Sequence, residues 1–404
     1  MNRVLIRSGR WVVVGAVALL GARASSAEPV ETPVPTAGGP VIRAPDATPT
    51  AAVAPSPTTI ACVGKFSCIP PEEAIQVTEG IWVRAGARRS FVFELIDSYG
   101  GGPVTIPVTM IRGTRPGPTL LLTSTIHGDE LNGVPVLLKL RERIDPNQLA
   151  GLVILLPVVN PYGFQRQTRY LPDRRDLNRF FPGNARGSLA NRIAQRIFRT
   201  FVSPSDFLVD FHTAAGNRSN APHVRGDPAS SDALRLAQGF GGIVVLHAAA
   251  PGTLRYAATA AGVPTAVFEG GENGRFDPKS VEAGLRGTEN VLASLGMLSR
   301  TERSAARPLW MRYSPWIRAN EGGIVELAVA LGDLVQENQL LLTIQDTLDG
   351  KRTEVRAPNP GIVMAVAQSP VAEPGYALLR LGIIQHEEGA EGPEPVEGEE
   401  EVPE

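Results

Sequence analysis

Apolar residues follow two different periods through the middle of the chain. Residues 105–111, 119–126 and 152–159 are short apolar runs rich in β-branched side chains, a pattern that predicts strands. Residues 132–143 and 188–201 carry apolar side chains three and four positions apart, which predicts helices with one buried face. Because strands and helices alternate, we expect an α/β domain with a largely parallel or mixed sheet.

The composition changes near residue 306 and at both ends of the chain. Residues 307–385 are short alternating runs separated by glycine- and proline-rich turns, typical of a small all-β domain. Residues 61–306 contain the α/β pattern and form the larger predicted domain. Residues 28–60 are rich in Pro, Ala and Thr, and residues 386–404 in Glu and Gly. Such segments cannot bury a core, which indicates a disordered spacer and a solvated acidic tail.

Residues 1–27 have the features of a bacterial secretory signal peptide. Three arginines precede an apolar stretch at residues 11–20, and small residues follow it up to Ala27. The apolar stretch is too short for a membrane-spanning helix, and no later segment is long and apolar enough. We therefore predict export to the periplasm or the extracellular space, with cleavage after Ala27 and no membrane span afterwards. An uncleaved anchor is the alternative.

Five residues separate the two cysteines, Cys62 and Cys68. In an exported protein this pair predicts a small disulfide loop at the start of the larger domain. A zinc site without a nearby histidine and a pair of free thiols are the alternatives. The net charge of -2 gives no basic field that would attract nucleic acid.

Two histidines directly follow apolar runs. His127 and Glu130 come after residues 119–126, and His212 comes after the short run 207–211. Ligands of α/β sheets gather at the carboxyl ends of strands. Two histidines and one carboxylate leave the fourth position of a catalytic zinc open. These residues therefore predict one Zn²⁺ per chain on His127, Glu130 and His212, with a surface turn and a buried structural histidine as the alternatives.

A carboxylate ends another apolar run, residues 263–268. Glu269 follows this run, beside two glycines, and is the predicted base that takes a proton from water and returns it to a leaving amine. Glu272 is the nearby competitor. The structural alternative is a carboxylate at the end of a strand that faces solvent.

Residues 169–183 form a loop rich in groups that bind anions. Guanidinium and amide groups suit a substrate carboxylate and a developing oxyanion. A solvated loop with a salt bridge from Asp176 is the alternative. The loop contains Arg169, Arg174, Arg175, Asn178 and Arg179.

Five motifs in order resemble the succinylglutamate desuccinylase/aspartoacylase family of the zinc carboxypeptidase clan. The resemblance extends over roughly residues 77–300. The motifs are HGDELNG (127–133), PVVNPYGF (157–164), DLNRFFPG (176–183), DFHT (210–213) and VFEGG (267–271).

The resemblance implies a zinc-carboxypeptidase-like mixed sheet flanked by helices and followed by a small all-β domain. That β domain resembles a lipoyl/biotinyl-like fold. Lys351 lies near the place of a carrier lysine, but the sequence around it does not reproduce a carrier hairpin. We therefore expect a β domain that shapes or covers the active site.

The resemblance also implies roles in substrate binding. Asn178 and Arg179 are expected to bind a substrate carboxylate, and Arg169 to polarise the scissile carbonyl. This loop is longer than the family pattern, so Arg174 is the alternative for that role. Arg218 is expected to line the site.

The implied reaction is hydrolysis of an N-acyl amino acid by zinc on the three predicted ligands, with Glu269 as the proton shuttle. The expected partner is thus a small N-acyl amino acid or a short peptide. An exported metallocarboxypeptidase or peptide amidase is the first alternative, since the same metal site serves it. A noncatalytic binding protein is the second. The oligomeric state is not predicted.

Overall fold

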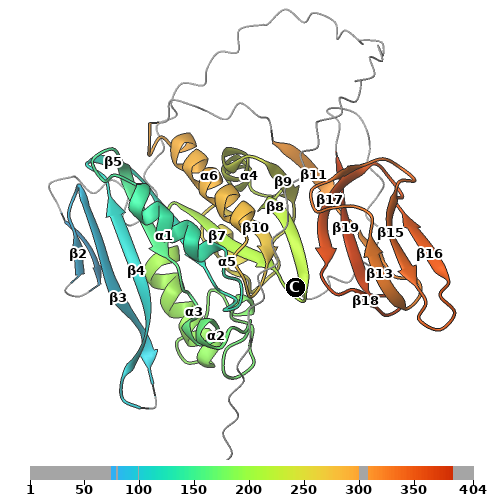
Figure 1. Ribbon diagram of the computed structural model, residues 1–404. Helices are drawn as coiled ribbons and strands as arrows, with labels where there is room; N and C mark the ends of the chain where they lie inside the picture. Colours follow the sequence, from blue (N-terminus) through green and yellow to red (C-terminus); the bar gives the residue numbers. More distant parts are fainter. Residues whose placement is uncertain (1–73, 79–80, 99, 300–307, 385–404) are drawn as a thin grey trace, which may run out of the picture. The chain divides into compact units, whose positions relative to one another are not determined.

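The computed structural model describes residues 74–78, 81–98, 100–299 and 308–384 (Figure 1). The predicted signal peptide, spacer, Cys62–Cys68 disulfide and acidic tail lie outside these residues and stay predictions.

Ten strands lie before residue 300 in the described chain. Two short ones, β1 (Ile75–Thr78) and β2 (Ile81–Val83), pair with each other. The others are β3 (Ala87–Asp97), β4 (Pro103–Arg112), β5 (Arg115–Ser124), β6 (Ala150–Leu156), β7 (Phe207–Ala214), β8 (Arg218–Gly226), β9 (Ile243–Leu246) and β10 (Thr265–Glu272).

The described residues after 307 form strands and turns and contain no helix. The strands are β11 (Leu309–Tyr313), β12 (Trp316–Arg318), β13 (Gly323–Leu327), β14 (Leu334–Val335), β15 (Leu340–Gln345), β16 (Arg352–Arg356), β17 (Gly361–Ala367), β18 (Val371–Ala372) and β19 (Ala377–Ile384). The boundary at residue 306 and the likeness to a lipoyl/biotinyl domain stay predictions.

A mixed sheet of 13 strands confirms the predicted α/β class. Its order is β14-β17-β19-β11-β9-β8-β10-β7-β5-β6-β4-β3, and β12 pairs with β19. The centre β6-β5-β7-β10 is parallel, whereas β4 and β8 join it antiparallel. β17 also pairs with β8, so the path β8-β9-β11-β19-β17 returns to β8. A separate sheet has the order β16-β15-β13-β18.

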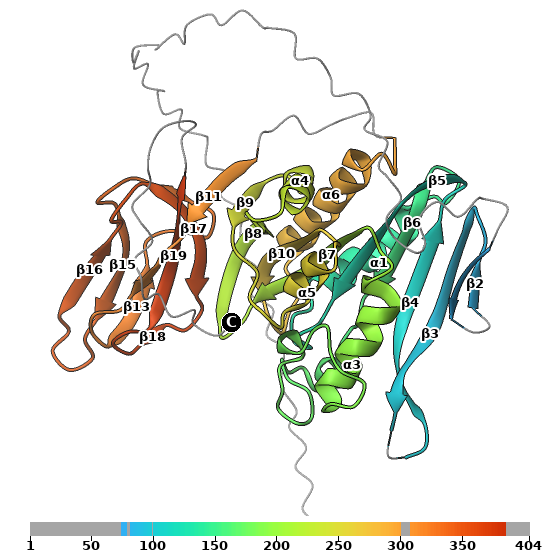
Figure 2. The same ribbon diagram turned by 180° about the vertical axis from the view of Figure 1, so that it is seen from behind.

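Helices cover both faces of the central strands. One face carries α1 (Gly133–Arg143), α4 (Ser231–Phe240) and α6 (Pro278–Ser294), as Figure 1 shows. The other face carries α3 (Leu189–Ile197) and α5 (Leu254–Ala260), seen from behind in Figure 2. None of the described helices has the length and apolar character needed to cross a bilayer.

The alternation of side chains along the strands explains the two helical layers. Leu121 and Leu208 pack into the core beneath α3 and α5. Leu120, Leu122 and Val209, their neighbours in sequence, pack into the core beneath α1, α4 and α6. Successive side chains of a strand point to opposite faces, so a run that is apolar at every position must be covered on both sides.

The predicted elements differ from the observed ones mainly at their ends. β5 ends at Ser124 and β6 at Leu156, before the last residues of the predicted runs. Thr125 has a φ of 55°, which takes the chain out of the strand conformation. The predicted helix 188–201 is observed as α3, capped by the Ser188 side chain, and a π-helical turn, Phe198–Val202.

Two of the sequence motifs meet in a close backbone contact. A Cβ built on Gly128 would lie 1.9 Å from the carbonyl carbon of Gly163, in the short helix α2 (Pro161–Arg166). Asn160 holds this contact, because its Oδ1 accepts from the Gly163 amide at 2.8 Å and its Nδ2 donates to the Ile126 carbonyl at 3.2 Å. The loop that carries His127 is therefore fixed against α2 by a glycine–glycine contact.

Gly128→Ala tests this contact. Because the methyl group has no space between two backbones, we expect a loss of about 1–3 kcal/mol in the free energy of unfolding and weaker binding of added Zn²⁺. Urea unfolding and metal titration measure the two effects. Gly102→Ala is the matched control, since a Cβ there meets no atom within 4 Å. Wild-type stability and metal affinity in Gly128→Ala would contradict this account.

Candidate active site

The predicted metal ligands meet at the carboxyl ends of two neighbouring parallel strands. His127 and Glu130 lie in the loop between β5 and α1, and His212 lies near the end of β7, which pairs with β5. The three residues are 3%, 2% and 6% exposed. The parallel sheet thus brings distant parts of the sequence into one buried group.

The carboxylate of Glu130 lies between the two imidazoles. Its Oε1 is 2.7 Å from His127 Nδ1, and its Oε2 is 2.8 Å from His212 Nδ1. The backbone amide of Thr213 donates to Oε2 at 3.1 Å. One ligand atom from each of the three residues lies within 4.8 Å of the other two. Two imidazole nitrogens and one carboxylate are donors that zinc accepts, so the group could hold this metal.

A second carboxylate lies behind each imidazole. His127 Nε2 is 3.1 Å from Asp176 Oδ1, and His212 Nε2 is 2.9 Å from Asp210 Oδ2. Thr123 Oγ1 donates to the other oxygen of Asp210 at 2.6 Å. Ligating histidines commonly donate their outer N–H to such a carboxylate, which fixes the ring and leaves the other nitrogen for the metal. This arrangement supports the fit of the group to a metal.

Electrostatics within this group favour positive charge at the imidazoles. Burial alone would lower the pKa of both histidines. The charge of Glu130 and the hydrogen bonds that His127 makes to Asp176 and Glu130 outweigh burial and raise the pKa of His127. Asp210 and Glu130 together raise the pKa of His212 well above its ordinary value. Burial would likewise raise the pKa of Glu130, but the two histidines hold it well below its usual range. The carboxylates therefore stabilise a cation here, whether protons or a metal supply the charge.

Glu269 lies on β10, directly opposite the histidine of β7 in the strand pairing. It is 2% exposed. Asn220 Nδ2 donates to its Oε2 at 3.2 Å, and Arg225 Nη2 is 3.6 Å from its Oε1. The competitor Glu272 pairs with Arg275 and does not line the cavity described below. The structure thus brings Glu269, and not Glu272, to the predicted ligands.

The arginine-rich loop is held against the predicted metal group. Arg169 is 7% exposed, and its Nη1 donates to Glu130 Oε1 at 3.2 Å. Its Nε and Nη2 both donate to Asp176 Oδ2, at 3.2 and 3.0 Å. Asn178 accepts from the backbone amide at the start of α5 at 2.8 Å, and the exposed Arg179 lies beside it. The salt bridge to Asp176 thus exists, but it is part of the site and not of a solvated loop.

Arg174, the predicted alternative to Arg169, is not brought to the site. It is exposed, has a φ of 62° and does not line the cavity. Residues 172–175 are exposed and form a turn, closed by a hydrogen bond from the Arg174 amide to the Leu171 carbonyl. The prediction that Arg174 binds substrate therefore finds no support in its position.

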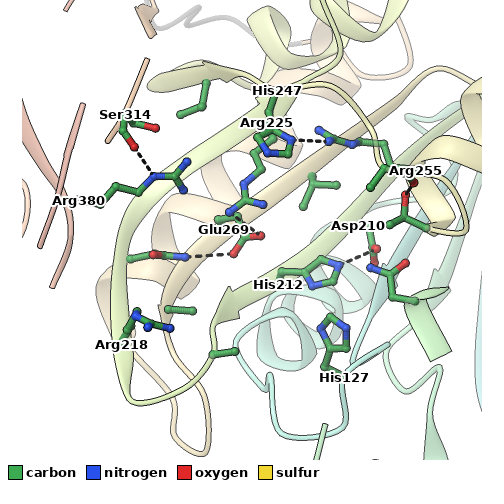
Figure 3. A pocket seen from close by; sticks show the side chains of 18 of the residues that line it. His127, Asp210, His212, Arg218, Arg225, His247, Arg255, Glu269, Ser314 and Arg380 are labelled. Atoms are coloured by element: carbon green, nitrogen blue, oxygen red, sulfur yellow. Dashed lines mark hydrogen bonds and ion pairs between the residues drawn. The ribbon is translucent and has the colours of Figure 1, made fainter. Parts of the chain in front are cut away.

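A cavity of about 480 Å³ opens beside these residues (Figure 3). His127, His212 and Glu269 line it together with residues of β8, α5, β12 and β19. Its carboxylates are Asp210 and Glu269. Its arginines are Arg169, Arg179, Arg218, Arg225, Arg255, Arg318 and Arg380. This excess of positive charge favours an anionic ligand.

Several residues of the site were missed in the sequence. Asn220 and Arg225 contact Glu269 from β8, a strand that the apolar pattern did not predict because polar residues interrupt it. Arg255 lies in the first turn of α5 and donates to His247 Nδ1 at 2.9 Å. Arg380 comes from the β strands after residue 307. β8 has the sequence RSNAPHVRG with a single β-branched residue, Val224, so the local pattern gave no signal for this strand.

Residues 116–295 match the profile of the Succinylglutamate desuccinylase/Aspartoacylase catalytic domain. N-alpha-acetyl-L-2,4-diaminobutyric acid deacetylase of Halomonas elongata is 31% identical over 284 residues, which cover 67% of this chain and 83% of that protein. The chain belongs to the succinylglutamate desuccinylase/aspartoacylase family.

Solved structures of this family have the same fold. Succinylglutamate desuccinylase/aspartoacylase from Rhodobacter sphaeroides is 28% identical, with a TM-score of 0.65 over 74% of this chain and 95% of that one. The product-bound ectoine utilization protein EutE (DoeB) from Ruegeria pomeroyi is 25% identical, with a TM-score of 0.64 over 73% and 95% of the two chains. The resemblance predicted from the motifs is thus confirmed.

Asp210→Asn tests whether the carboxylate behind His212 supports metal binding. The substitution keeps the shape of the side chain but removes the charge beside His212. We expect Zn²⁺ affinity to fall by about 10- to 100-fold, measured by competition with a chelator. Asp97→Asn, at an exposed strand end, is the control. Unchanged affinity in Asp210→Asn would show that Asp210 does not support a metal ligand.

Proposed function

We propose that this protein is a zinc-dependent amidohydrolase that cleaves N-acyl amino acids into a carboxylate and an amino acid. One observation carries the proposal: two members of the buried His127–Glu130–His212 group, the histidines, line the same arginine-rich cavity as Glu269. The Halomonas elongata relative is a deacetylase by name, and this agrees with amide hydrolysis.

The metal would be held by the three side chains of that group. When bound, zinc would lower the pKa of water and polarise a carbonyl oxygen. Asp176 and Asp210 would keep the two imidazoles turned toward the metal by accepting their outer N–H groups. The protein would thus supply a fixed set of ligands before substrate enters.

Glu269 would move the proton. Asn220 and Arg225 contact its two oxygens, which holds the carboxylate in the cavity. As the base, Glu269 would take a proton from the attacking water. It then gives this proton to the amine that leaves, so the same residue serves as base and acid.

The arginines would bind the charges of substrate and oxyanion. Arg169 lies against Glu130 and is therefore the guanidinium next to the predicted metal group. It would stabilise the negative charge that develops on the carbonyl oxygen. Asn178 and Arg179 line the same cavity and would bind the carboxylate of the amino acid.

A small substrate is favoured over a peptide. The cavity volume of about 480 Å³ lies within the range of small-molecule sites, roughly 300–1,000 Å³. Exported metallocarboxypeptidase or peptide amidase activity remains the first alternative. Comparing hydrolysis of N-acetyl and N-succinyl amino acids with that of dipeptides separates them. A zinc-loaded protein that cleaves no amide would favour the noncatalytic alternative.

Two substitutions separate the proton shuttle from the metal ligands. Glu269→Gln should retain Zn²⁺ and lower kcat by about 10²- to 10⁴-fold, because proton transfer is lost. His212→Ala should lose both Zn²⁺ and activity. Metal content by atomic emission and kcat on a cleaved amide measure the outcome.

Glu272→Gln is the matched control, since Glu272 lies on the same strand outside the cavity. It should retain wild-type turnover. A fully active Glu269→Gln, or an inactive Glu272→Gln that binds Zn²⁺ normally, would show that the base is assigned to the wrong residue.

Export is a separate part of the proposal and rests on the sequence of residues 1–27 alone. Full-length protein produced in a bacterial host should appear in the periplasmic fraction or the medium. Its N-terminus should begin after Ala27 when determined by mass spectrometry. Protein that stays in the cytoplasm with residues 1–27 attached would contradict export.

A further inference from the structure

Asn132 belongs to the HGDELNG motif but has no part in the proposed reaction, and it does not line the cavity. We propose that Asn132 is a positioning residue for Glu269. Its side chain ties the loop between β5 and α1, which carries the predicted metal ligand Glu130, to a bulge directly after Glu269. This inference rests on the proposed function, because it takes Glu269 as the proton shuttle.

Strand β10 is irregular directly after Glu269. Glu269 pairs with His212 of β7. The next pair is Glu272 with Ala214, so β10 has one more residue than β7 between the two pairs. Gly271, within this bulge, has a φ of 74°, a conformation that side chains other than glycine rarely allow. Bulges bend a strand, re-aim its side chains and interrupt its backbone hydrogen bonds. The direction of the Glu269 side chain therefore depends on what holds the residues that follow it.

The side chain of Asn132 holds this bulge. It is 1% exposed, and its Nδ2 donates to the carbonyl of Gly270 at 2.9 Å. Its Oδ1 accepts from the backbone amide of Asp277 at 2.8 Å. A carbonyl only accepts and a backbone N–H only donates, so these partners fix the orientation of the Asn132 amide. Gly270 follows Glu269 directly, and Asn132 is two residues from Glu130. One side-chain hydrogen bond thus links the ligand loop to the shuttle, in addition to the pairing of β7 with β10.

Capping of α1 does not explain these contacts. Asn132 is the N-cap of α1, and asparagine is a favoured capping residue when its backbone is extended. Here its backbone is helical, with φ -62° and ψ -27°, and its side chain makes no capping hydrogen bond. Asp277, the N-cap of α6, does cap its own helix through the amides of Lys279 and Ser280. The hydrogen bonds of Asn132 therefore serve the contact between two segments and not its own helix.

The two segments fit closely around Asn132. A Cβ built on Gly271 would lie 2.5 Å from Asn132 Nδ2 and 3.0 Å from Asp277 Cβ. Helices α1 and α6, which begin just after Asn132 and Asp277, pack against each other on one face of the sheet (Figure 1). A second link joins the same segments, since Asn273 Nδ2 donates to Asp129 Oδ2 at 2.8 Å. The segments therefore stay joined when Asn132 is replaced, and its loss acts on the bulge.

Asn132→Ala tests the positioning role. It removes both hydrogen bonds of the side chain, so the carbonyl of Gly270 and the bulge lose their support. We expect kcat on an N-acyl amino acid that the wild type cleaves to fall by about 10- to 100-fold, because a displacement of roughly 1 Å can have such an effect. KM and the content of bound Zn²⁺ should stay at wild-type values.

Two further variants separate positioning from folding. Asn132→Leu has a side chain of similar size and no hydrogen-bonding group, and it should show the same loss in kcat with the space filled. Asn290→Ala is the matched control, because Asn290 Nδ2 also donates to a backbone carbonyl, that of Phe240 at 3.2 Å, outside the cavity. It should keep wild-type kcat. Wild-type kcat in both Asn132 variants, or loss of Zn²⁺ from them, would overturn the proposal.

A double-mutant cycle shows whether Asn132 acts through Glu269. Asn132→Ala should lower kcat little further in protein that already carries Glu269→Gln, because the group that it positions is gone. Two independent roles would instead give effects that multiply. Multiplied effects would therefore show that Asn132 acts on something other than Glu269.

The position of Glu269 can also be measured without turnover. Crystal structures of the Zn²⁺-loaded wild type and of Asn132→Leu compare the contact of Glu269 Oε2 with Asn220 Nδ2, which is 3.2 Å here. A displaced carboxylate supports the positioning role even if no amide is cleaved, in which case the proposed function alone fails. An unmoved carboxylate would overturn the positioning role, and hydrolysis of N-acyl amino acids would then leave the function standing.

Discussion

The candidate site depends on the hydrogen bonds and ion pairs that the buried carboxylate of Glu130 makes with its neighbours. Its two oxygens form hydrogen bonds with four groups: His127, His212, Arg169 and the backbone amide of Thr213. A buried carboxylate is costly unless all such partners are in place. The loop after β5, the end of β7 and the arginine-rich loop therefore form one electrostatic unit. Loss of any partner leaves buried charge uncompensated.

Rigid supports surround this unit. Asp210 is held by Thr123 on the neighbouring strand, and the His127 loop packs by Gly128 against Gly163 of α2. Thr123 and Gly128 themselves are not among the residues that line the cavity. They matter because metal ligands must be positioned before a metal or a substrate arrives. The parallel strands provide this, since neighbouring carboxyl ends lie at one edge of the sheet.

The strands after residue 307 contribute to the same cavity through backbone pairing. Asn220 contacts Glu269 by its side chain, while its backbone pairs with Ala365 of β17. One strand, β8, thus connects the predicted proton shuttle with Trp316 and Arg380. Family motifs supply the predicted metal ligands, whereas these later strands add Arg318 and Arg380 to the lining of the same cavity.

Local sequence was enough to predict the central strands and the group His127, Glu130, His212 and Glu269, because apolar period and strand ends are local features. It did not decide between Arg169 and Arg174. The tertiary structure buries Arg169 against Glu130 and leaves Arg174 in an exposed turn, which sequence alone did not predict. Arg218 was expected to line the site and does, whereas Arg380, which lines the same cavity, had no local signal. Which strands become neighbours depends on packing between distant segments, and periodicity within one strand carries no information about its partner.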